Sequence, residues 1–404
     1  MRKLNPIISW WVTPKLPYED IVAKHNLISK WITHPIKRRI ARVYLNFLKK
    51  VGKIKVIAIT GSTGKTTTTE ILASILKEDG ETVYSATGVD PVYNIPNTIL
   101  RAKLSTKYLI LEMSVEYKNE MDYYLWLASP DVGLITNIDA THIKYFENID
   151  GVLEEKGKLL KSLSRKNLAL INTDDLKIMS LKKYIKAKIV FFGIKSEIFY
   201  SKVTFNSDMS TDFVLNINSI TKNIHINAFG LPVVNNALAS IAVAHTLGLS
   251  LEKIASGLEK FRMPPHRLNI VNSKNSGLVF DDTYNSNPKA ASESLDAFCI
   301  AAGKRKKIVV IGDMLELGNI EEGAHRNLGK KIGNIGVDYL IAVGSAARFI
   351  LEEASKKINK SNCYLVQNYL EAFEIVNKLR NSKSAIFVKG SRSIHLDKLV
   401  EKLI

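Results

Sequence analysis

The chain has 404 residues, of which 46% are hydrophobic and 24% are charged, a composition typical of globular proteins with two or three domains. The apolar run at residues 7–12 stops before Pro14 and is too short for a signal peptide or a membrane span. The two cysteines, Cys299 and Cys363, lack the spacing of a zinc or redox site. We expect a cytoplasmic protein, and we also expect a monomer that binds no nucleic acid.

The net charge of +18 is concentrated near the N-terminus, because residues 1–50 contain 11 Lys or Arg residues and only Glu19 and Asp20 as acids. Three of the four tryptophans lie in the same segment. Basic residues interleaved with Trp suit a membrane surface or an anionic, nucleotide-linked substrate. A solvated basic helix face is the more common explanation, so membrane association of this segment is a hypothesis.

The segment Val56–Ala73 has the order of strand, glycine-rich loop and helix that a phosphate-binding loop requires. Its loop is a shortened form of the pattern G-x-x-x-x-G-K-[ST], with Thr60 in the place of the first glycine. Glycines let backbone N–H groups surround a phosphate, Lys65 adds a positive charge, and the Thr66 hydroxyl can ligate Mg²⁺. A glycine-rich turn before an ordinary helix is the alternative, and the combination of strand, loop, lysine and helix argues against it. We predict a nucleoside triphosphate site formed by Gly61, Ser62, Thr63, Gly64, Lys65, Thr66 and Thr67.

Three further apolar segments, at residues 108–114, 131–138 and 168–175, alternate with helix-like segments, which predicts a doubly wound α/β domain. The carboxyl ends of parallel strands face the ligand crevice, so Glu112 is placed to hold Mg²⁺. His142 follows the next strand and could be a metal ligand through a neutral ring nitrogen. A surface Glu at a strand end and a structural His are the alternatives.

The segment at residues 88–96 is rich in Gly, Pro and Asn and is predicted to be a loop that reaches over a ligand. Asn94 and the nearby Asn97 are candidate substrate contacts. From about residue 191 to residue 229 the pattern changes to short alternating strands with Asn-Ser turns, which predicts a small antiparallel flap.

The two prolines in residues 262–267 predict a linker, since they can continue neither a helix nor a central strand. We therefore expect a basic N-terminal segment at 1–52, a central ATP-binding domain at 53–263 and a C-terminal α/β domain at 264–404. The C-terminal domain contains further apolar strands, each of which runs into a polar loop of the kind that builds sites.

Seven segments, in chain order, resemble the motifs of the Mur ligase family: TGSTGKTTTTEIL, LEMS, LITNIDATHIKYF followed by EEKGKLL, NNALASIAVAHTLG, DDTYNSNPKAASESLDAF, IGDMLELG and VKGSRS. The resemblance covers residues 54–404, and DDTYNSNP and GDMLELG are most similar to the members that add D-alanyl-D-alanine to a UDP-muramoyl tripeptide. It implies a central P-loop ATPase domain, a Rossmann-like C-terminal domain and an ATP-driven ligase of cell-wall precursor synthesis. A substrate carboxylate would attack the γ-phosphate to give an acyl phosphate, from which an incoming amine displaces phosphate.

The resemblance also implies roles for individual residues. Thr66 and Glu112 would hold one Mg²⁺, and His142 would help hold a second one, bridged by Lys156, which is carbamylated in the family. A carbamate turns a cationic side chain into an oxygen ligand, whereas an unmodified Lys156 would repel the ion. The implied catalytic residues are Lys65, Lys156 and His142.

The adenine of the nucleotide would contact Asn236. Its ribose or phosphates would contact Arg267 and Asp282. Closure of the C-terminal domain would exclude water that would otherwise hydrolyse the acyl phosphate. The residues implied at the interface between the domains or around the amine donor are Tyr284, Asn285, Asn287, Asp313, Glu316, His325, Lys389, Ser391 and Arg392.

The sequence departs from the family pattern in two places. Pro232 and Val233 stand where the family has a His-Asn pair before Asn236. Only residues 1–55 precede the first strand, where the family has a whole domain that grips the UDP part of the substrate. We hypothesise that the basic N-terminal segment takes this role by binding an anionic, nucleotide- or lipid-linked acceptor.

Two other functions stay open at this point. One is a related ligase with another acceptor, such as an archaeal pseudomurein peptide ligase or a polyglutamate-adding enzyme, which the short N-terminus favours. The other is a noncatalytic ATP-binding partner of a wall-synthesis complex. The joint presence of Lys65, Glu112, His142 and Lys156 argues against the second, because a scaffold has no use for a two-metal site.

Overall fold

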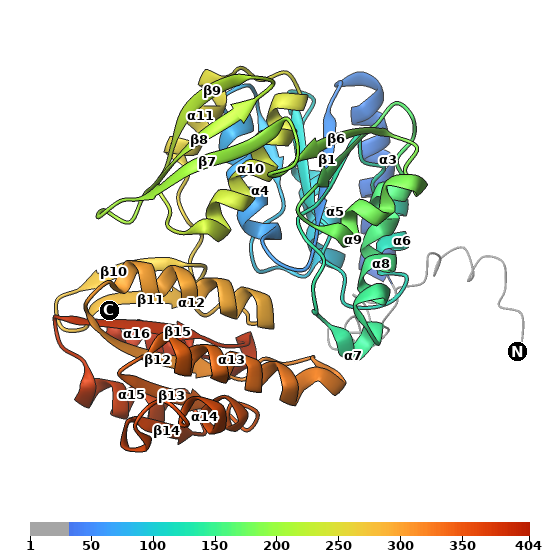
Figure 1. The fold of residues 1–404 in the computed structure, drawn as a ribbon. Helices are drawn as coiled ribbons and strands as arrows, with labels where there is room; N and C mark the ends of the chain where they lie inside the picture. Colours follow the sequence, from blue (N-terminus) through green and yellow to red (C-terminus); the bar gives the residue numbers. More distant parts are fainter. Residues whose placement is uncertain (1–31) are drawn as a thin grey trace, which may run out of the picture.

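The computed structural model describes residues 32–404. The three N-terminal tryptophans and most of the predicted basic segment therefore lie outside the described residues. The described chain forms two α/β units, one above the other in the view of Figure 1. Within it, no helix combines the length and the apolar character that crossing a membrane requires.

The upper unit is built on a six-stranded parallel sheet, which confirms the predicted doubly wound α/β domain. The strand order is β2-β3-β1-β4-β5-β6. Helices α4, α10 and α11 share a hydrophobic core on one face of this sheet, and α3, α5, α6 and α8 share another core on the opposite face. The strands are β1 (Lys55–Thr60), β2 (Thr82–Tyr84), β3 (Tyr108–Glu112), β4 (Val132–Ile135), β5 (Leu168–Asn172) and β6 (Lys188–Phe192); the helices are α3 (His34–Val51), α4 (Lys65–Leu76), α5 (Pro91–Arg101), α6 (Glu120–Leu127), α7 (Ile143–Phe146), α8 (Ile149–Lys161), α9 (Leu176–Ser180), α10 (Leu231–Thr246) and α11 (Leu251–Lys260).

The predicted loop at residues 88–96 is wrong, because helix α5 begins at Pro91. Asp90 caps this helix by accepting a hydrogen bond from the Val92 N–H. Pro91 is tolerated in the first turn, because the backbone N–H groups there have no hydrogen-bond partner within the helix. Apolar residues of the helix, among them Ile95 and Ile99, are buried against the sheet. Gly88 thus precedes the helix and Pro91 begins it, whereas Asn94 and Pro96 lie inside it.

Helix α3 packs onto the same face of the sheet. Ala41, Leu45 and Leu48 are fully buried in the core that α5 and α6 also build. Part of the basic segment predicted at 1–52 is therefore an integral helix of the upper unit.

The predicted antiparallel flap is confirmed as the three-stranded sheet β7 (Ile198–Phe205), β8 (Thr211–Ile217) and β9 (Ile220–Ile226). Its apolar side chains join the core around α10 and α11. Helix α10 begins at Leu231, with Pro232 in its first turn.

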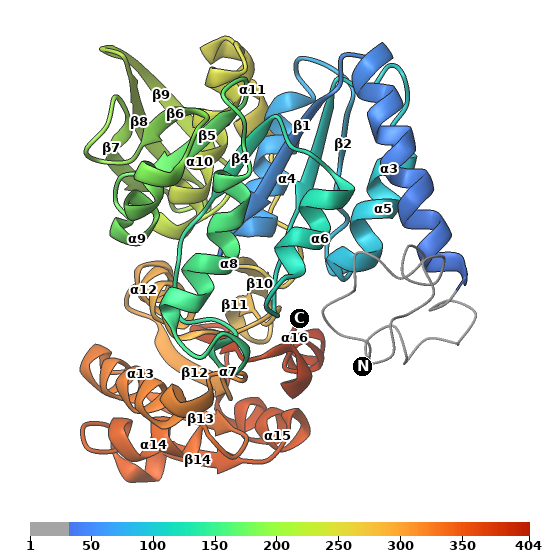
Figure 2. The same ribbon diagram turned by 90° about the vertical axis from the view of Figure 1, so that its right-hand side faces the viewer.

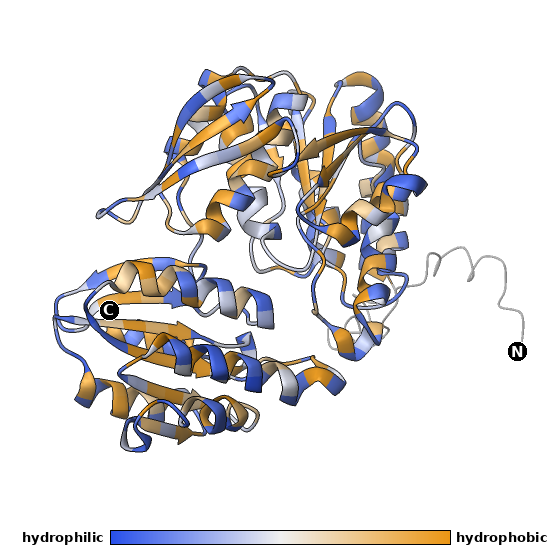
Figure 3. Cartoon of the chain, in the orientation of Figure 1, coloured by the Kyte–Doolittle hydropathy of each residue, from blue (hydrophilic) through white to orange (hydrophobic). Residues whose placement is uncertain are grey.

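The lower unit has a second six-stranded sheet in the order β10-β11-β15-β12-β13-β14, in which only the β10–β11 pair is antiparallel. The edge strands β10 and β14 were not predicted, because both are short and only partly buried. Figure 3 shows that the strands of both units are mainly hydrophobic, as buried parallel sheets require. The strands are β10 (Asn269–Ser273), β11 (Gly277–Asp282), β12 (Lys306–Gly312), β13 (Tyr339–Val343), β14 (Cys363–Val366) and β15 (Ser384–Lys389); the helices are α12 (Pro288–Ala302), α13 (Glu321–Ile335), α14 (Arg348–Ala354), α15 (Tyr369–Leu379) and α16 (Asp397–Leu403), with a 3₁₀ turn η3 (Gly318–Ile320).

Candidate active site

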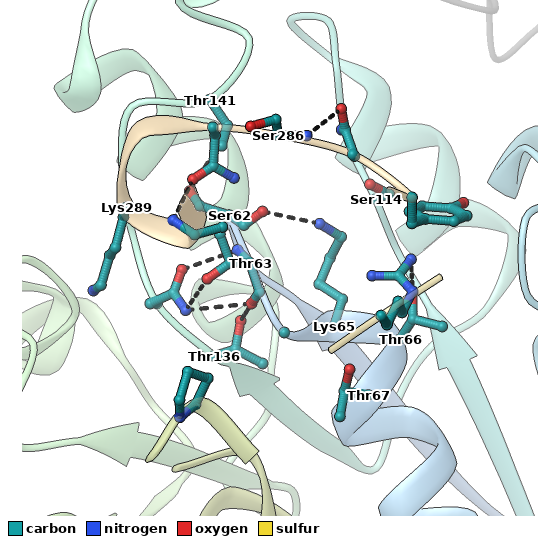
Figure 4. Close-up of a pocket in the computed structure, with 18 of the residues that line it drawn as sticks. Ser62, Thr63, Lys65, Thr66, Thr67, Ser114, Thr136, Thr141, Ser286 and Lys289 are labelled. Atoms are coloured by element: carbon teal, nitrogen blue, oxygen red, sulfur yellow. Dashed lines mark hydrogen bonds between the residues drawn. The ribbon is translucent and has the colours of Figure 1, made fainter. Parts of the chain in front are cut away.

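A cleft of about 1170 Å³ lies between the two units. The carboxyl ends of β1, β3 and β4 lie on one side of it and those of β11 and β15 on the other, because each sheet is parallel at these strands. This is where polar loops of α/β folds gather around ligands. Figure 4 shows Ser62, Lys65 and Thr66 of the upper unit facing Ser286 of the lower unit across this cleft.

Asn137, at the end of the β4 segment, fixes the phosphate loop. Its side-chain oxygen accepts a hydrogen bond from the Thr63 N–H at 3.0 Å, and its backbone oxygen accepts one from the Ser62 N–H at 3.0 Å. The Thr136 hydroxyl donates to the Thr63 carbonyl oxygen at 2.6 Å. Neither Thr136 nor Asn137 was predicted as a site residue, although their place at a strand end was a usable signal.

Position 64 requires a glycine both because of its backbone conformation and because a neighbouring side chain lies close to it. Its φ is +77°, and a Cβ added there would lie 2.3 Å from Oδ1 of Asn236. The predicted adenine contact Asn236 therefore packs directly against the phosphate loop, and it also lines the cleft. A larger residue at position 64 would displace this asparagine.

Lys65 is partly buried, and its Nζ donates hydrogen bonds to the backbone oxygens of Gly61 at 2.9 Å and Ser62 at 3.3 Å. Burial lowers the pKa of Lys65, and the nearby Glu112 carboxylate opposes this shift. The lysine is thus held inside the loop in which a phosphate would lie.

Thr66 joins residues from three parts of the chain. Its hydroxyl donates to the Glu112 carboxylate at 3.2 Å and accepts from Nη2 of Arg267 at 2.9 Å. The Arg267 guanidinium in turn stacks on the Tyr284 ring, 3.7 Å from the ring centroid. The structure therefore brings together four predicted site residues that are far apart in the sequence.

Lys156, on helix α8, is 1% exposed. Its Nζ lies 3.5 Å from the Val115 carbonyl oxygen, and no carboxylate among residues 32–404 forms a salt bridge with it. Burial lowers the pKa of Lys156 to about 7, and the positive charge of Lys65 acts in the same direction. A buried lysine without an ion-pair partner loses its proton readily.

His142 and Glu316 connect the two units. The His142 Nδ1 lies 2.5 Å from Oε2 of Glu316, and the Lys144 N–H donates to the Glu316 backbone oxygen at 3.2 Å. Glu116 completes a group whose possible ligand atoms all lie within 4.8 Å of one another. Burial raises the pKa of Glu116, whereas the hydrogen bond from His142 lowers that of Glu316. Imidazole and carboxylate ligands of this kind suit a divalent cation.

The lower wall of the cleft contains a buried ion pair. Lys389 donates to the Asp282 carboxylate at 2.5 Å and to the Asn285 backbone oxygen at 2.9 Å. The Ser294 hydroxyl donates to the same carboxylate at 2.6 Å. Lys389 and Asp282, predicted as separate substrate and nucleotide contacts, therefore hold each other in place.

Five of the remaining predicted contacts line the cleft, together with residues that were not predicted, such as Lys289 and Glu293. Asn94 also lines it, but its amide is engaged by the Ala86 backbone, accepting from the N–H at 3.1 Å and donating to the oxygen at 2.7 Å. The unpredicted Lys289 and Glu293 belong to the first two turns of α12 and lie within the recognised motif DDTYNSNPKAASESLDAF. The five predicted residues are Tyr284, Asn285, Asn287, Ser391 and Arg392.

Three predicted substrate contacts are not among the residues that line the cleft. Asn97 is exposed on α5. The Asp313 carboxylate accepts the backbone N–H groups of Ser345 and Ala347. His325 is fully buried and accepts the Met314 N–H at 3.0 Å. Asp313 and His325 therefore order the loop that carries Glu316, and sequence spacing alone could not separate that role from substrate contact.

A phosphate loop at the edge of one parallel sheet, facing a second α/β unit across a deep cleft, defines an ATP-dependent enzyme whose reaction takes place between two domains. Residues 59–244 match the Mur ligase middle domain, and residues 266–392 match the Mur ligase glutamate ligase domain. The chain therefore belongs to the Mur ligase family, and it is an ATP-dependent carboxylate–amine ligase of cell-wall precursor synthesis.

Known relatives agree with this assignment. The UDP-N-acetylmuramoyl-tripeptide–D-alanyl-D-alanine ligase of Buchnera aphidicola subsp. Acyrthosiphon pisum is 31% identical over 363 residues, which cover 89% of this chain and 78% of the relative. A crystal structure of MurF from Acinetobacter baumannii matches with a TM-score of 0.81 and 28% identity, covering 91% of this chain and 80% of that one. MurF of Thermotoga maritima in complex with ADP has the same fold, with a TM-score of 0.81 at 24% identity over 92% of this chain and 83% of that one. The predicted family, fold class and enzyme class are confirmed.

Proposed function

We propose that this ligase joins D-alanyl-D-alanine to the terminal carboxylate of a UDP-linked muramoyl tripeptide. The observation that carries the proposal is the cleft, in which Lys65, Thr66 and Glu112 of one unit face Arg392 and Tyr284 of the other. The named activity of the Buchnera relative, which is similar over 89% of this chain, supports the choice of substrates.

The reaction has two displacements. A carboxylate oxygen attacks the γ-phosphorus of ATP, the bond from phosphorus to the bridging oxygen breaks, and ADP leaves with the electron pair. The amine nitrogen then attacks the acyl carbon, the bond from that carbon to the phosphate oxygen breaks, and the nitrogen loses a proton. Lys65 and the loop N–H groups would stabilise the phosphate charge, and Arg267 would align the nucleotide beside Thr66.

The donor atoms on this side of the cleft fit Mg²⁺. The Thr66 hydroxyl and the Glu112 carboxylate lie within hydrogen-bond distance of each other, and oxygen ligands of this kind are what Mg²⁺ prefers. We assign the first ion to these two residues and the second to His142 and a carbamylated Lys156. The bound ions would neutralise phosphate charge.

The surroundings of Lys156 support its carbamylation. A pKa of about 7 leaves much of the amine neutral near neutral pH, and only the neutral amine has the electron pair that attacks the carbon of CO₂. A nitrogen–carbon bond forms, a proton leaves, and the side chain becomes an anion with two oxygen atoms. Carbon-13 NMR in labelled bicarbonate tests this step, and a missing carbamate signal in wild type would refute it.

The residues that hold the acceptor are a separate part of the proposal. We propose that the basic residues 1–31 contribute a cationic contact to an anionic, nucleotide- or lipid-linked acceptor, and that the enzyme works as a cytoplasmic monomer. A deletion that tests this must stop at residue 31, because Ala41 and Leu45 of α3 belong to the core. An unchanged acceptor KM after this deletion would contradict the contact.

The decisive experiment measures phosphate release from ATP and Mg²⁺ with UDP-muramoyl tripeptide and D-alanyl-D-alanine, together and singly, with mass spectrometry of the product. Release that requires both substrates and gives the pentapeptide supports the proposal. Lys65→Ala is the control for contaminating ATPases. If only a shorter or lipid-linked acceptor supports release, the ligase chemistry stands and the proposed acceptor is wrong.

A further inference from the structure

Helix α3 has a second apolar face that the fold does not use. Five large apolar side chains are between 40% and 69% exposed and follow one another at intervals of four, three, four and four residues. This spacing places them in one stripe along the helix. We call the five residues the outer stripe: Ile36, Ile40, Val43, Phe47 and Val51.

The outer stripe lies opposite the buried side of the helix. Ala41, Leu45 and Leu48 point into the core, so the orientation of α3 is fixed and the stripe is held outward. Figure 2 shows α3 along the outer flank of the upper unit. The 18 residues of the helix span about 27 Å at 1.5 Å per residue, so the stripe is long and straight. Exposed apolar surfaces that are continuous in this way mark interaction sites.

The charged residues that neighbour the stripe in the sequence are all basic. Residues 21–69 contain no Asp or Glu. Lys37, Lys50 and Lys53 are exposed beside or just beyond the stripe. Two other cations of the helix are engaged by the protein itself, because Lys49 pairs with Asp131 and Arg42 lies 4.6 Å above the Trp126 ring. The free lysines therefore surround the apolar surface with positive charge.

We propose that α3 docks this ligase on an anionic lipid bilayer, with the outer stripe inserted at the boundary between headgroups and acyl chains. An apolar stripe bordered by lysines is the pattern that binds such a surface, because insertion and attraction to anionic headgroups act together. A second copy of the chain fits less well, since pairing two stripes would bring like charges together. The proposal does not depend on which substrates the ligase joins.

The test uses the full-length protein and flotation with vesicles of phosphatidylcholine containing about 30% phosphatidylglycerol, compared with phosphatidylcholine alone. The test variant is Val43→Glu with Phe47→Glu. The matched control is Ile220→Glu with Leu370→Glu, which makes the same charge change at two residues that are also exposed, at 59% and 51%. Wild type and control should bind the anionic vesicles equally, and the stripe variant should bind at least about tenfold more weakly.

Charge and apolar insertion are separated by a second pair of substitutions. Lys37→Gln and Lys50→Gln should each weaken binding to anionic vesicles about fivefold and leave binding to neutral vesicles unchanged. Equal binding by the stripe variant and its matched control would overturn the proposal, since the net charge of the whole chain would then explain the binding.

Two further readouts identify other occupants of the stripe, and either would overturn the proposal. Light scattering that shows a dimer in wild type and a monomer in the stripe variant would assign the stripe to a second copy. A lower melting temperature of the stripe variant without lipid would show that residues 1–31 of the same chain cover it. Unchanged ligase turnover of both variants confirms that they are folded.

Discussion

Each of the two units contains a fully buried lysine, and the two lysines differ in what surrounds them. Lys389 in the lower wall is paired with Asp282, which Ser294 also binds. Lys156 on α8 of the upper unit has a backbone oxygen at 3.5 Å as its hydrogen-bond partner and forms no salt bridge within residues 32–404. Both are 1% exposed, so burial alone does not distinguish them.

The presence or absence of a carboxylate partner distinguishes a structural buried lysine from a reactive one. A buried cation with a carboxylate partner keeps its charge and fixes the loop around it, whereas a buried cation without one is driven toward the neutral amine. The neutral amine is the form that chemistry can modify. We therefore expect substitution of Lys389 to affect mainly stability and substitution of Lys156 to affect mainly turnover.

The largest effect is expected from Lys389→Ala. The change leaves the Asp282 carboxylate buried without its partner, which should lower the free energy of unfolding by about 3–5 kcal/mol. Denaturant unfolding measures it. The control is Lys398→Ala, with an expected change within about 0.5 kcal/mol, because that lysine pairs with no carboxylate. A loss of turnover at full stability would assign Lys389 to the reaction and contradict the comparison.

Lys156→Ala should lower turnover rather than stability. We expect turnover to fall about 10²- to 10³-fold, because the proposed metal ligand would be lost, while the fold remains stable. Added acetate or formate should restore part of the rate by supplying a carboxylate in the vacated space. Lys161→Ala, on the same helix, is the control. Unaffected turnover of the alanine variant would exclude the proposed role of Lys156.

Glu316→Gln probes the contact between the two walls. It weakens the hydrogen bond with His142 and leaves the loop backbone in place, so we expect turnover to fall about tenfold with little change in stability. Small-angle X-ray scattering should show a more open average arrangement of the units. Glu321→Gln, five residues later, serves as the control. A compact scattering profile with normal turnover would show that the contact has no role in closure.

The last prediction is a pH dependence of stability in CO₂-free buffer. Lys156 has a folded-state pKa of about 7 against 10.5 unfolded, so the unfolded chain binds more protons between these values. Stability should therefore rise with pH from about 7 to about 10.5, by at most about 1.4 kcal/mol per unit for one proton. Lys156→Met should reduce this slope without removing it, since burial also lowers the pKa of Lys65. An identical slope in the variant would refute the assignment.

Local patterns in the sequence were sufficient to predict several features of the structure. The phosphate loop was found because strand, glycines, lysine and helix follow one another within a few residues. The alternation of strands and helices predicted both α/β units, and the change to period-two strands predicted the flap. The capped start of α5 was misread, since glycine and prolines are compatible with a loop and with a helix that buries its apolar face.

Contacts between residues that are far apart in the sequence could be identified only from the tertiary structure. Thr66 and Arg267 are 201 residues apart, and His142 and Glu316 are 174 apart, yet each pair forms a hydrogen bond across the cleft. The different surroundings of Lys156 and Lys389 also depend on neighbours brought by other elements. Motif spacing shows which residue types are present, but the sign of a pKa shift and the direction of a side chain depend on packing between elements. The outer stripe of α3 became visible for the same reason, because burial of one face of the helix revealed the exposure of the other.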